Sequence, residues 1–122
     1  MYDLVIIGNG PAGLSAGIYA VRYGLDTLIL EKDVISGQIA LTDIVENYPG
    51  FSSIAGMELM DKFKEHAQEA GVTTEDGEVL NIKFDGDKQI ISTDEGEIEA
   101  KAVIIATGAN PQHLGVPSEE EF

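Results

Sequence analysis

The sequence contains no cysteine, and this absence excludes several kinds of chemistry from the chain. Without a thiol, the 122 residues can form no disulfide framework, no thiolate metal site and no redox pair of their own. Basic residues are also few, because 7 lysines and arginines stand against 22 acids, for a formal net charge of −15. Nucleic acids and anionic membranes both require a cationic surface, so we expect neither as a partner.

Long apolar runs are absent as well. No stretch approaches the roughly 20 residues of a membrane-spanning helix, and the N-terminal Met-Tyr-Asp lacks the basic start of a signal peptide. We therefore expect no membrane association and a cytoplasmic location. The apolar fraction of 43% is still enough for a packed core. The length suits one modest domain, which we predict to span residues 1–122.

Three segments near the N-terminus predict a strand–helix–strand unit. Residues 4–7 form a continuous aliphatic run, which is typical of a parallel strand covered on both faces. Residues 11–23 follow, with a proline in the first turn, alanines every four residues and Gly24 to end the helix. Residues 27–30 form a second aliphatic strand. Together they predict a right-handed βαβ crossover.

The rest of the chain predicts elements of both types. Residues 34–51 have no clear period and are expected to form a long loop, which is unusual unless it binds something. Residues 57–70 predict a second helix, and residues 102–106 another buried strand. An antiparallel meander is predicted for three short segments: 78–84, 88–93 and 97–100. The expected fold class is therefore α/β, with a Rossmann-like parallel sheet and a small antiparallel β-meander.

Residues 8–13 read GNGPAG and match the dinucleotide fingerprint G-x-G-x-x-G. Gly8 allows a sharp turn after the strand, Gly10 lets a diphosphate approach the backbone, and Gly13 lets the helix lie close to the sheet. Gly17, on the same helical face, extends that close approach. The N–H groups and the positive dipole end of the helix start can then hold the phosphates.

The second predicted strand ends on an acid, Glu31. A carboxylate about 20 residues after the fingerprint accepts hydrogen bonds from a ribose diol, and it repels a 2′-phosphate, so a preference for NADP is not expected. The fingerprint follows a strand, opens a helix and precedes this acid, and this context predicts nucleotide binding. It does not choose between NAD and FAD, because both contain an adenosine ribose and a diphosphate.

No catalytic constellation of another class is evident. His66 is expected on a solvated helix face and His113 in a polar tail, and two isolated histidines make no zinc site. Ser15 is not in a nucleophile elbow, and the acid-rich turns lack the spacing of a calcium loop. Met57 and its apolar neighbours on the second helix are expected in the core. We therefore expect no metal and no catalytic side chain in this chain.

Three further segments resemble thioredoxin reductase of the low-molecular-weight bacterial type, a family of flavoproteins with two dinucleotide-binding domains. They read SGQI at 36–39, DIVENYPGF at 43–51 and IIATGA at 104–109. The tail LGVPSEEEF at 114–122 also resembles the family's link into its NADPH domain. The ENYPG segment is far more specific than the glycine fingerprint. The resemblance covers essentially the whole chain and implies FAD as the cofactor.

The resemblance also implies where FAD would bind. The fingerprint would hold the diphosphate, Glu31 the ribose and the Val79 backbone the adenine, while Gln38 and Asn47 would face the flavin. From the residues alone, these two amides can equally be loop-stabilising. The family usually has two glycines before the glutamine, where this chain has Ser36 and one glycine. The predicted cofactor-binding residues are Gly8, Gly10, Pro11, Ala12, Gly13, Glu31, Lys32, Gly37, Gln38, Asn47, Val79, Ala106, Thr107 and Gly108.

In the resembled family, electrons pass from NADPH to FAD, to a Cys-x-x-Cys disulfide and then to thioredoxin. This chain has no cysteine and one glycine fingerprint. The resemblance therefore implies the N-terminal portion of the FAD domain of such an oxidoreductase, with the NADPH domain absent and the chain alone inactive. The alternative is a stand-alone or engineered module that binds FAD or ADP without turnover. We expect uncovered apolar surface and hence a homo-oligomer.

Overall fold

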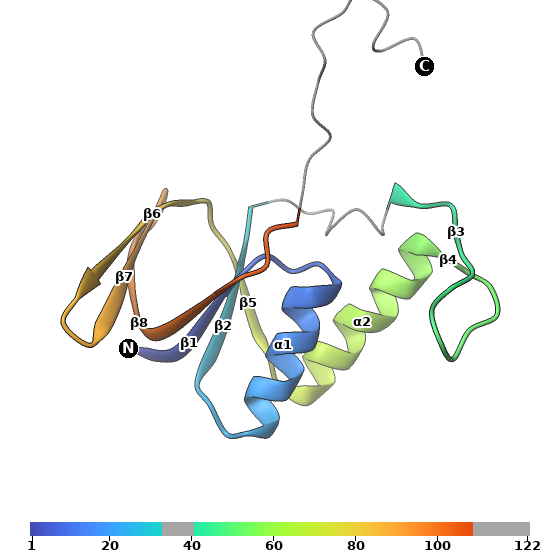
Figure 1. Cartoon of the computed structure of the whole chain (residues 1–122), viewed down its shortest axis with the longest axis horizontal. Coiled ribbons are helices and arrows are strands. Elements are labelled where there is room, and N and C mark those ends of the chain that lie inside the picture. The colour runs from blue at the N-terminus through green and yellow to red at the C-terminus, as the bar shows by residue number, and fades with distance from the viewer. Residues whose placement is uncertain (33–40, 109–122) are drawn as a thin grey trace, which may run out of the picture.

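Two helices and eight strands make up the part of the chain that the computed structural model describes, residues 1–32 and 41–108 (Figure 1). In chain order they are β1 (Tyr2–Ile7), α1 (Pro11–Arg22), β2 (Thr27–Glu31), β3 (Ile44–Val45), β4 (Ile54–Ala55), α2 (Gly56–Ala70), β5 (Thr73–Asp76), β6 (Val79–Asp85), β7 (Lys88–Thr93) and β8 (Gly96–Ile105). Neither helix is long and apolar enough, within these described residues, to cross a membrane.

One six-stranded sheet carries the fold, in the order β5-β2-β1-β8-β7-β6. Its first four strands are parallel, since β1 pairs in parallel with β2 and β8, and β2 with β5. The strands β8, β7 and β6 are antiparallel neighbours. The predicted α/β class, with a Rossmann-like parallel sheet and an antiparallel meander, is confirmed. The meander is not a separate layer, because it continues the same sheet.

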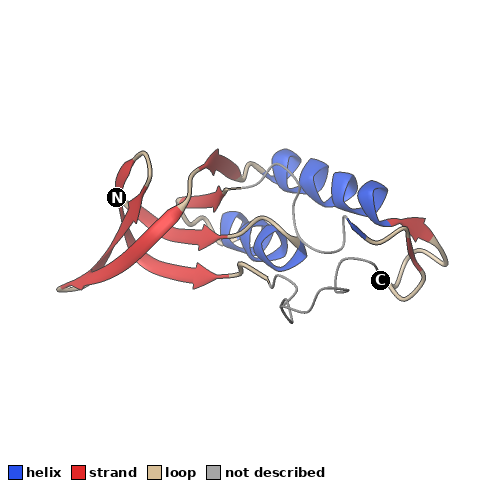
Figure 2. Ribbon diagram, turned by 90° about the horizontal axis from the view of Figure 1, so that it is seen from above, coloured by secondary structure: helices blue, strands red, loops and turns tan. Residues whose placement is uncertain are grey.

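The strand β8 spans two segments that were predicted as separate strands. Residues 97–100 and 102–106 were expected as separate strands, but β8 runs unbroken from Gly96 to Ile105. Ala100 is fully buried and pairs with Gln89 of β7 on one side and with Tyr2 of β1 on the other. One long strand therefore links the meander to the parallel sheet, as Figure 2 shows from above.

The strand β5 was not expected from the sequence. It reads Thr-Thr-Glu-Asp, and all four residues are exposed. A short polar segment gives no periodic signal. It becomes a strand because its backbone pairs with β2, in a register that places Thr74 opposite Ile29. The two-residue strands β3 and β4 also form a ladder inside or next to the expected loop.

The core lies on both faces of the parallel strands. Along β1, Ile6 packs with the helices and Val5 packs with the meander, as the alternating side chains of a strand require. Both helices lie side by side on one face (Figure 1). Gly17 allows the close approach that was predicted for it, because a Cβ there would lie 2.9 Å from Ile29 Cδ1 and 3.2 Å from Val72 Cγ1.

The helix α2 presents its apolar stripe to this core, with one exception to the predicted residues. Met60 and Ala67 are buried, and Gly71 ends the helix in the left-handed conformation, with φ of +96°. Met57, however, is 53% exposed, so its expected place in the core was wrong. At 100° per residue it points away from the stripe, and Leu59 is buried instead.

A surface contact at Asp3 fastens β1 to its neighbours. The Asp3 carboxylate accepts hydrogen bonds from the Asp26 backbone N–H at 2.9 Å and from Lys101 Nζ at 3.1 Å. Two contacts lower the pKa of Asp3 below its usual 3.8. The hydrogen bond from the Asp26 backbone has the larger effect, and the hydrogen bond from Lys101 has the smaller one. A lowered carboxylate pKa stabilises the fold at pH values above the unfolded-state pKa, and this stabilisation is lost as the pH falls through the native pKa.

This lowered pKa predicts a difference between the wild-type chain and Asp3→Asn on acidification. The wild type should lose more stability between pH 5 and pH 3, since only the wild type takes up a proton at this position. Urea unfolding at several pH values measures the difference. Parallel pH profiles for the two proteins would contradict the assigned contact.

Candidate functional site

A glycine-rich loop at the carboxyl end of β1 forms the centre of the candidate site. Gly8 adopts a φ of +109°, and its N–H donates to the Leu30 carbonyl at 2.8 Å. A Cβ at Gly8 would lie 2.2 Å from the Ala106 carbonyl oxygen and 3.1 Å from Thr107 Cα. The loop is therefore pressed against the end of β8, and both its conformation and its packing require glycine at this position.

The loop also folds back onto itself at Gly13. A Cβ on this residue would lie 1.8 Å from the Gly8 carbonyl oxygen and 3.5 Å from Ile6 Cγ2. Gly13 was predicted to let the helix approach the sheet, but its nearest neighbour is the loop backbone. The close approach of the helix to the sheet occurs at Gly17. At Gly8 and Gly13 the backbone of the loop is packed so closely that any side chain would occupy the space of a main-chain atom.

The start of α1 has no side-chain cap. Gly10 is the N-cap residue with φ of −72° and ψ of −169°, Pro11 opens the helix, and the first turn contains no acid. The Leu14 N–H donates to the Gly10 carbonyl at 3.0 Å. Because no side chain within residues 1–32 and 41–108 offers an acceptor to the preceding N–H groups, this helix start is suited to an anion, which the positive end of the helix dipole also favours.

The acid predicted to bind a ribose lies beside this loop. Glu31 Oε2 accepts a hydrogen bond from the Asn9 N–H at 2.9 Å, and its Oε1 accepts from the Lys32 N–H at 2.8 Å. The Glu31 carbonyl accepts from the Gly77 N–H at 2.9 Å. Asn9 and Glu31 are 22 residues apart in the sequence. The structure thus brings the fingerprint and the acid into direct contact.

The predicted residues after β8 join the same edge of the sheet. The Ala106 N–H donates to the Ile7 carbonyl at 2.8 Å, so the end of β8 runs beside the end of β1. Thr107 follows and lies beside Gly8, since a Cβ at Gly8 would be 3.1 Å from Thr107 Cα. Gly108 follows with φ of +71°. Val79 packs against the cluster that contains Leu30.

One predicted residue that the structure describes, Asn47, lies apart from this group. Asn47 is exposed in the turn between β3 and β4. Figure 1 shows the β3–β4 hairpin at one end of α2, opposite the end that leads into β5. Gly37 and Gln38 lie outside the described residues. Whether these residues face a common ligand therefore stays a prediction.

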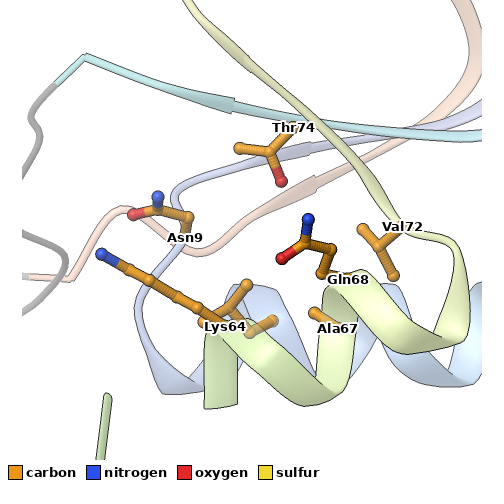
Figure 3. Close-up of a pocket in the computed structure, with 7 residues that line it drawn as sticks. Asn9, Lys64, Ala67, Gln68, Val72 and Thr74 are labelled. Atoms are coloured by element: carbon orange, nitrogen blue, oxygen red, sulfur yellow. The ribbon is translucent and has the colours of Figure 1, made fainter. Parts of the chain in front are cut away.

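Asn9 is a residue that sequence reasoning missed. It is 9% exposed, and its side-chain Oδ1 is buried without a hydrogen-bond partner among the residues that the structure describes. It lines a pocket of about 400 Å³ together with residues from α1, α2 and the β5 region: Leu14, Lys64, Ala67, Gln68, Val72 and Thr74. Figure 3 shows Lys64 reaching from α2 toward the Asn9 side chain. The sequence feature that could have identified Asn9 is its position as a polar residue between two glycines, directly after a buried strand.

The residues of this edge fit an adenylate with a diphosphate. The glycine loop presents backbone without side chains, the helix start offers uncapped N–H groups, and the Glu31 carboxylate provides acceptors for a diol. Among the described residues no group of three metal-binding side chains occurs, and His66 is exposed as expected. The arrangement is chemically suited to holding an anion and a sugar.

Comparison with known proteins gives one family match over nearly the whole chain. The family described as pyridine nucleotide-disulphide oxidoreductase matches residues 2–122. Thioredoxin reductase of Bacillus subtilis is 43% identical over 122 residues, covering 100% of this chain and 39% of that protein. A 34.2 kDa protein in the rubredoxin operon of Clostridium pasteurianum is 49% identical over 121 residues, covering 98% of this chain and 39% of its own length.

Solved structures show the same likeness. The thioredoxin reductase of Lactococcus lactis matches with a TM-score of 0.93 and 45% identity, over 99% of this chain and 40% of that one. A ferredoxin-flavin thioredoxin reductase of Clostridium acetobutylicum matches with a TM-score of 0.83 and 35% identity, over 99% of this chain and 42% of that one. The chain therefore spans about two fifths of the length of these relatives.

Proposed function

The chain belongs to the pyridine nucleotide-disulphide oxidoreductase family, and on this premise we propose that residues 1–122 form one FAD-binding unit of a thioredoxin reductase-like flavoprotein. The observation that carries the proposal is the contact between the glycine loop and the acid, the Asn9 N–H to Glu31 Oε2 hydrogen bond of 2.9 Å. The uncapped start of α1 thus lies next to a carboxylate, which supports the proposal because an adenosine diphosphate requires an anion site beside an acceptor for its ribose.

Each part of the site has a role in this proposal. The backbone of the loop and the start of α1 hold the diphosphate, and Glu31 accepts hydrogen bonds from the ribose. The segment from Ala106 to Gly108, of which Ala106 and Thr107 lie against Gly8, is assigned to the border of the cofactor site, and the Val79 backbone is assigned to the adenine. Asn47 is assigned to the flavin end. Bound FAD would supply hydride and electron transfer between a nicotinamide and a disulfide.

For the whole protein we propose transfer of electrons through FAD to the disulfide of a thioredoxin-like protein. Support comes from the relatives named thioredoxin reductase in Bacillus subtilis and Lactococcus lactis. The donor is proposed as NADPH. A ferredoxin is the second candidate, since one solved relative is named a ferredoxin-flavin thioredoxin reductase. The acceptor cysteines are not in this sequence, which contains none.

Purified chain tests the proposal directly. We expect it to bind FAD, seen as flavin absorbance after desalting or as quenching of flavin fluorescence on titration, and to bind ADP at the same site in competition. Because the sequence holds one glycine fingerprint and no cysteine, NADPH should not reduce the bound flavin. Failure of both FAD and ADP to bind would refute the proposed function. Rapid, complete bleaching by stoichiometric NADPH would contradict this expectation and overturn the proposal that the chain is only the FAD-binding part of the enzyme.

Self-association stays a prediction. Apolar side chains are exposed on β8, where Ile105 is 68% exposed, and on β6 at Leu80 and Phe84. Exposed apolar side chains of this size favour association with a partner. Sedimentation across a concentration series should show a homo-oligomer, and a monomer at all concentrations would contradict it.

A further inference from the structure

Three aromatic rings connect the β3–β4 hairpin to α2. The Tyr48 ring centroid lies 6.4 Å from that of Phe51, with the planes 26° apart, and 5.4 Å from that of Phe63 on α2, edge to face at 62°. Lys62 Nζ lies 5.9 Å from the centroid of the Phe51 ring. We call Tyr48, Phe51 and Phe63 the aromatic clamp. Both ring geometries are among those that aromatic pairs prefer.

The local sequence brings the first two rings together. Residues 48–51 read Tyr-Pro-Gly-Phe, and the Phe51 N–H donates to the Tyr48 carbonyl at 3.2 Å. Gly50 has a φ of +106°. Proline followed by a glycine with positive φ is the signature of a type II turn. Such a turn brings its first and fourth residues close together, which are Tyr48 and Phe51.

The third ring ties this turn to the rest of the molecule. Val45, Ile54 and Leu59 form a small buried cluster beneath the hairpin, and Phe63 packs against it. Phe63 also packs against the main core, which contains Met60. A single side chain is thus shared between the hairpin and the core, so the position of the turn is set relative to the parallel sheet.

We propose that the aromatic clamp positions Asn47 for the flavin end of FAD, so that Tyr48 and Phe51 are positioning residues. Asn47 directly precedes the turn and is exposed, while Tyr48, though 40% exposed, is held on two sides by rings. An exposed amide contributes more to binding affinity when its backbone is already ordered, because ordering it on binding has an entropic cost. The inference rests on the proposed function, and it adds residues that act through Asn47.

The variant Phe51→Leu tests the clamp, with Phe84→Leu as the matched control. Phe51 stacks on Tyr48, whereas Phe84 is 81% exposed on β6, so the same chemical change is made away from the hairpin. Phe51→Leu should lower FAD affinity about threefold to tenfold while ADP affinity changes less than about twofold. Phe84→Leu should change neither, and Phe51→Tyr, which keeps a ring, should retain FAD affinity.

A measurement without nucleotide gives a second readout. The ¹⁵N order parameter of the Asn47 amide should be near the rigid value of about 0.85 in the wild type and in Phe84→Leu, and below about 0.6 in Phe51→Leu. Equal losses of FAD and ADP affinity, or an unchanged order parameter, would overturn the inference and leave FAD binding intact. A wild-type chain that binds neither nucleotide would overturn the proposed function and the inference together.

Discussion

Gly13→Ala is expected to abolish measurable FAD binding. A Cβ at this position would lie 1.8 Å from the Gly8 carbonyl oxygen, and a backbone atom cannot move aside as the end of a flexible side chain can. The loop must therefore shift, and with it the N–H groups proposed to hold the diphosphate. We expect the free energy of unfolding to fall by about 3 kcal/mol and FAD affinity to fall at least about 100-fold, which corresponds to roughly 2.8 kcal/mol.

Urea unfolding and FAD titration measure these two effects, with titration restricted to conditions in which the variant is folded. Gly77→Ala is the matched control, because a Cβ there would meet only Leu30 Cδ2, at an ordinary 3.6 Å. It should be as stable as the wild type or up to about 1 kcal/mol more stable. If Gly13→Ala keeps wild-type stability and FAD affinity, the loop does not have the close packing described for it.

Replacing Glu31 should produce the second large effect. Its carboxylate accepts the Asn9 N–H at 2.9 Å, and a hydrogen bond to a charged group contributes about 1.5–3 kcal/mol. Glu31→Ala removes this contact as well as the proposed ribose contact, so we expect the affinities for ADP and FAD to fall about 10-fold to 100-fold. Glu31→Gln retains one acceptor oxygen, so its affinities for ADP and FAD should fall about 10-fold or less.

The charge of Glu31 also predicts a change in specificity. A carboxylate repels a 2′-phosphate, so the wild type should bind ADP more tightly than its 2′-phosphorylated form, and Glu31→Gln should reduce this ratio at least about 10-fold. Asp76→Asn changes the net charge equally and is the control, because Asp76 stands opposite Glu31 on β5 and is exposed. Calorimetric titration with both nucleotides measures the ratio. An equal change in both variants would assign the effect to net charge alone.

The predictable part of this fold was local in sequence. The strand–helix–strand unit over residues 2–31 follows from continuous aliphatic runs, a proline in the first helical turn and a glycine after the helix. The antiparallel pairs β6–β7 and β7–β8 follow from short alternating segments with tight turns between them. Met57 was misassigned because an apolar residue near the start of a helix can lie beside the buried stripe rather than on it.

Other features depended on pairing partners that a sequence pattern does not reveal. The strand β5 is polar throughout, and only its register with β2 makes it part of the sheet. The strand β8 is one element because it pairs with β7 along one part and with β1 along the other. The pairings of β5 with β2 and of β8 with β1 are made between segments distant in sequence, so local propensity was overridden there by tertiary structure.

For the candidate site, the sequence by itself determined which residues are chemically suited to a nucleotide: glycines at 8, 10 and 13 before a helix, and the acid at 31 after a strand. Only the tertiary structure decided that the Ala106 carbonyl closes over Gly8, that Glu31 holds the Asn9 N–H, and that the Asn9 side chain faces a pocket. The physical reason is the parallel sheet. It gathers the carboxyl ends of β1, β2 and β8 at one edge although they are far apart along the chain.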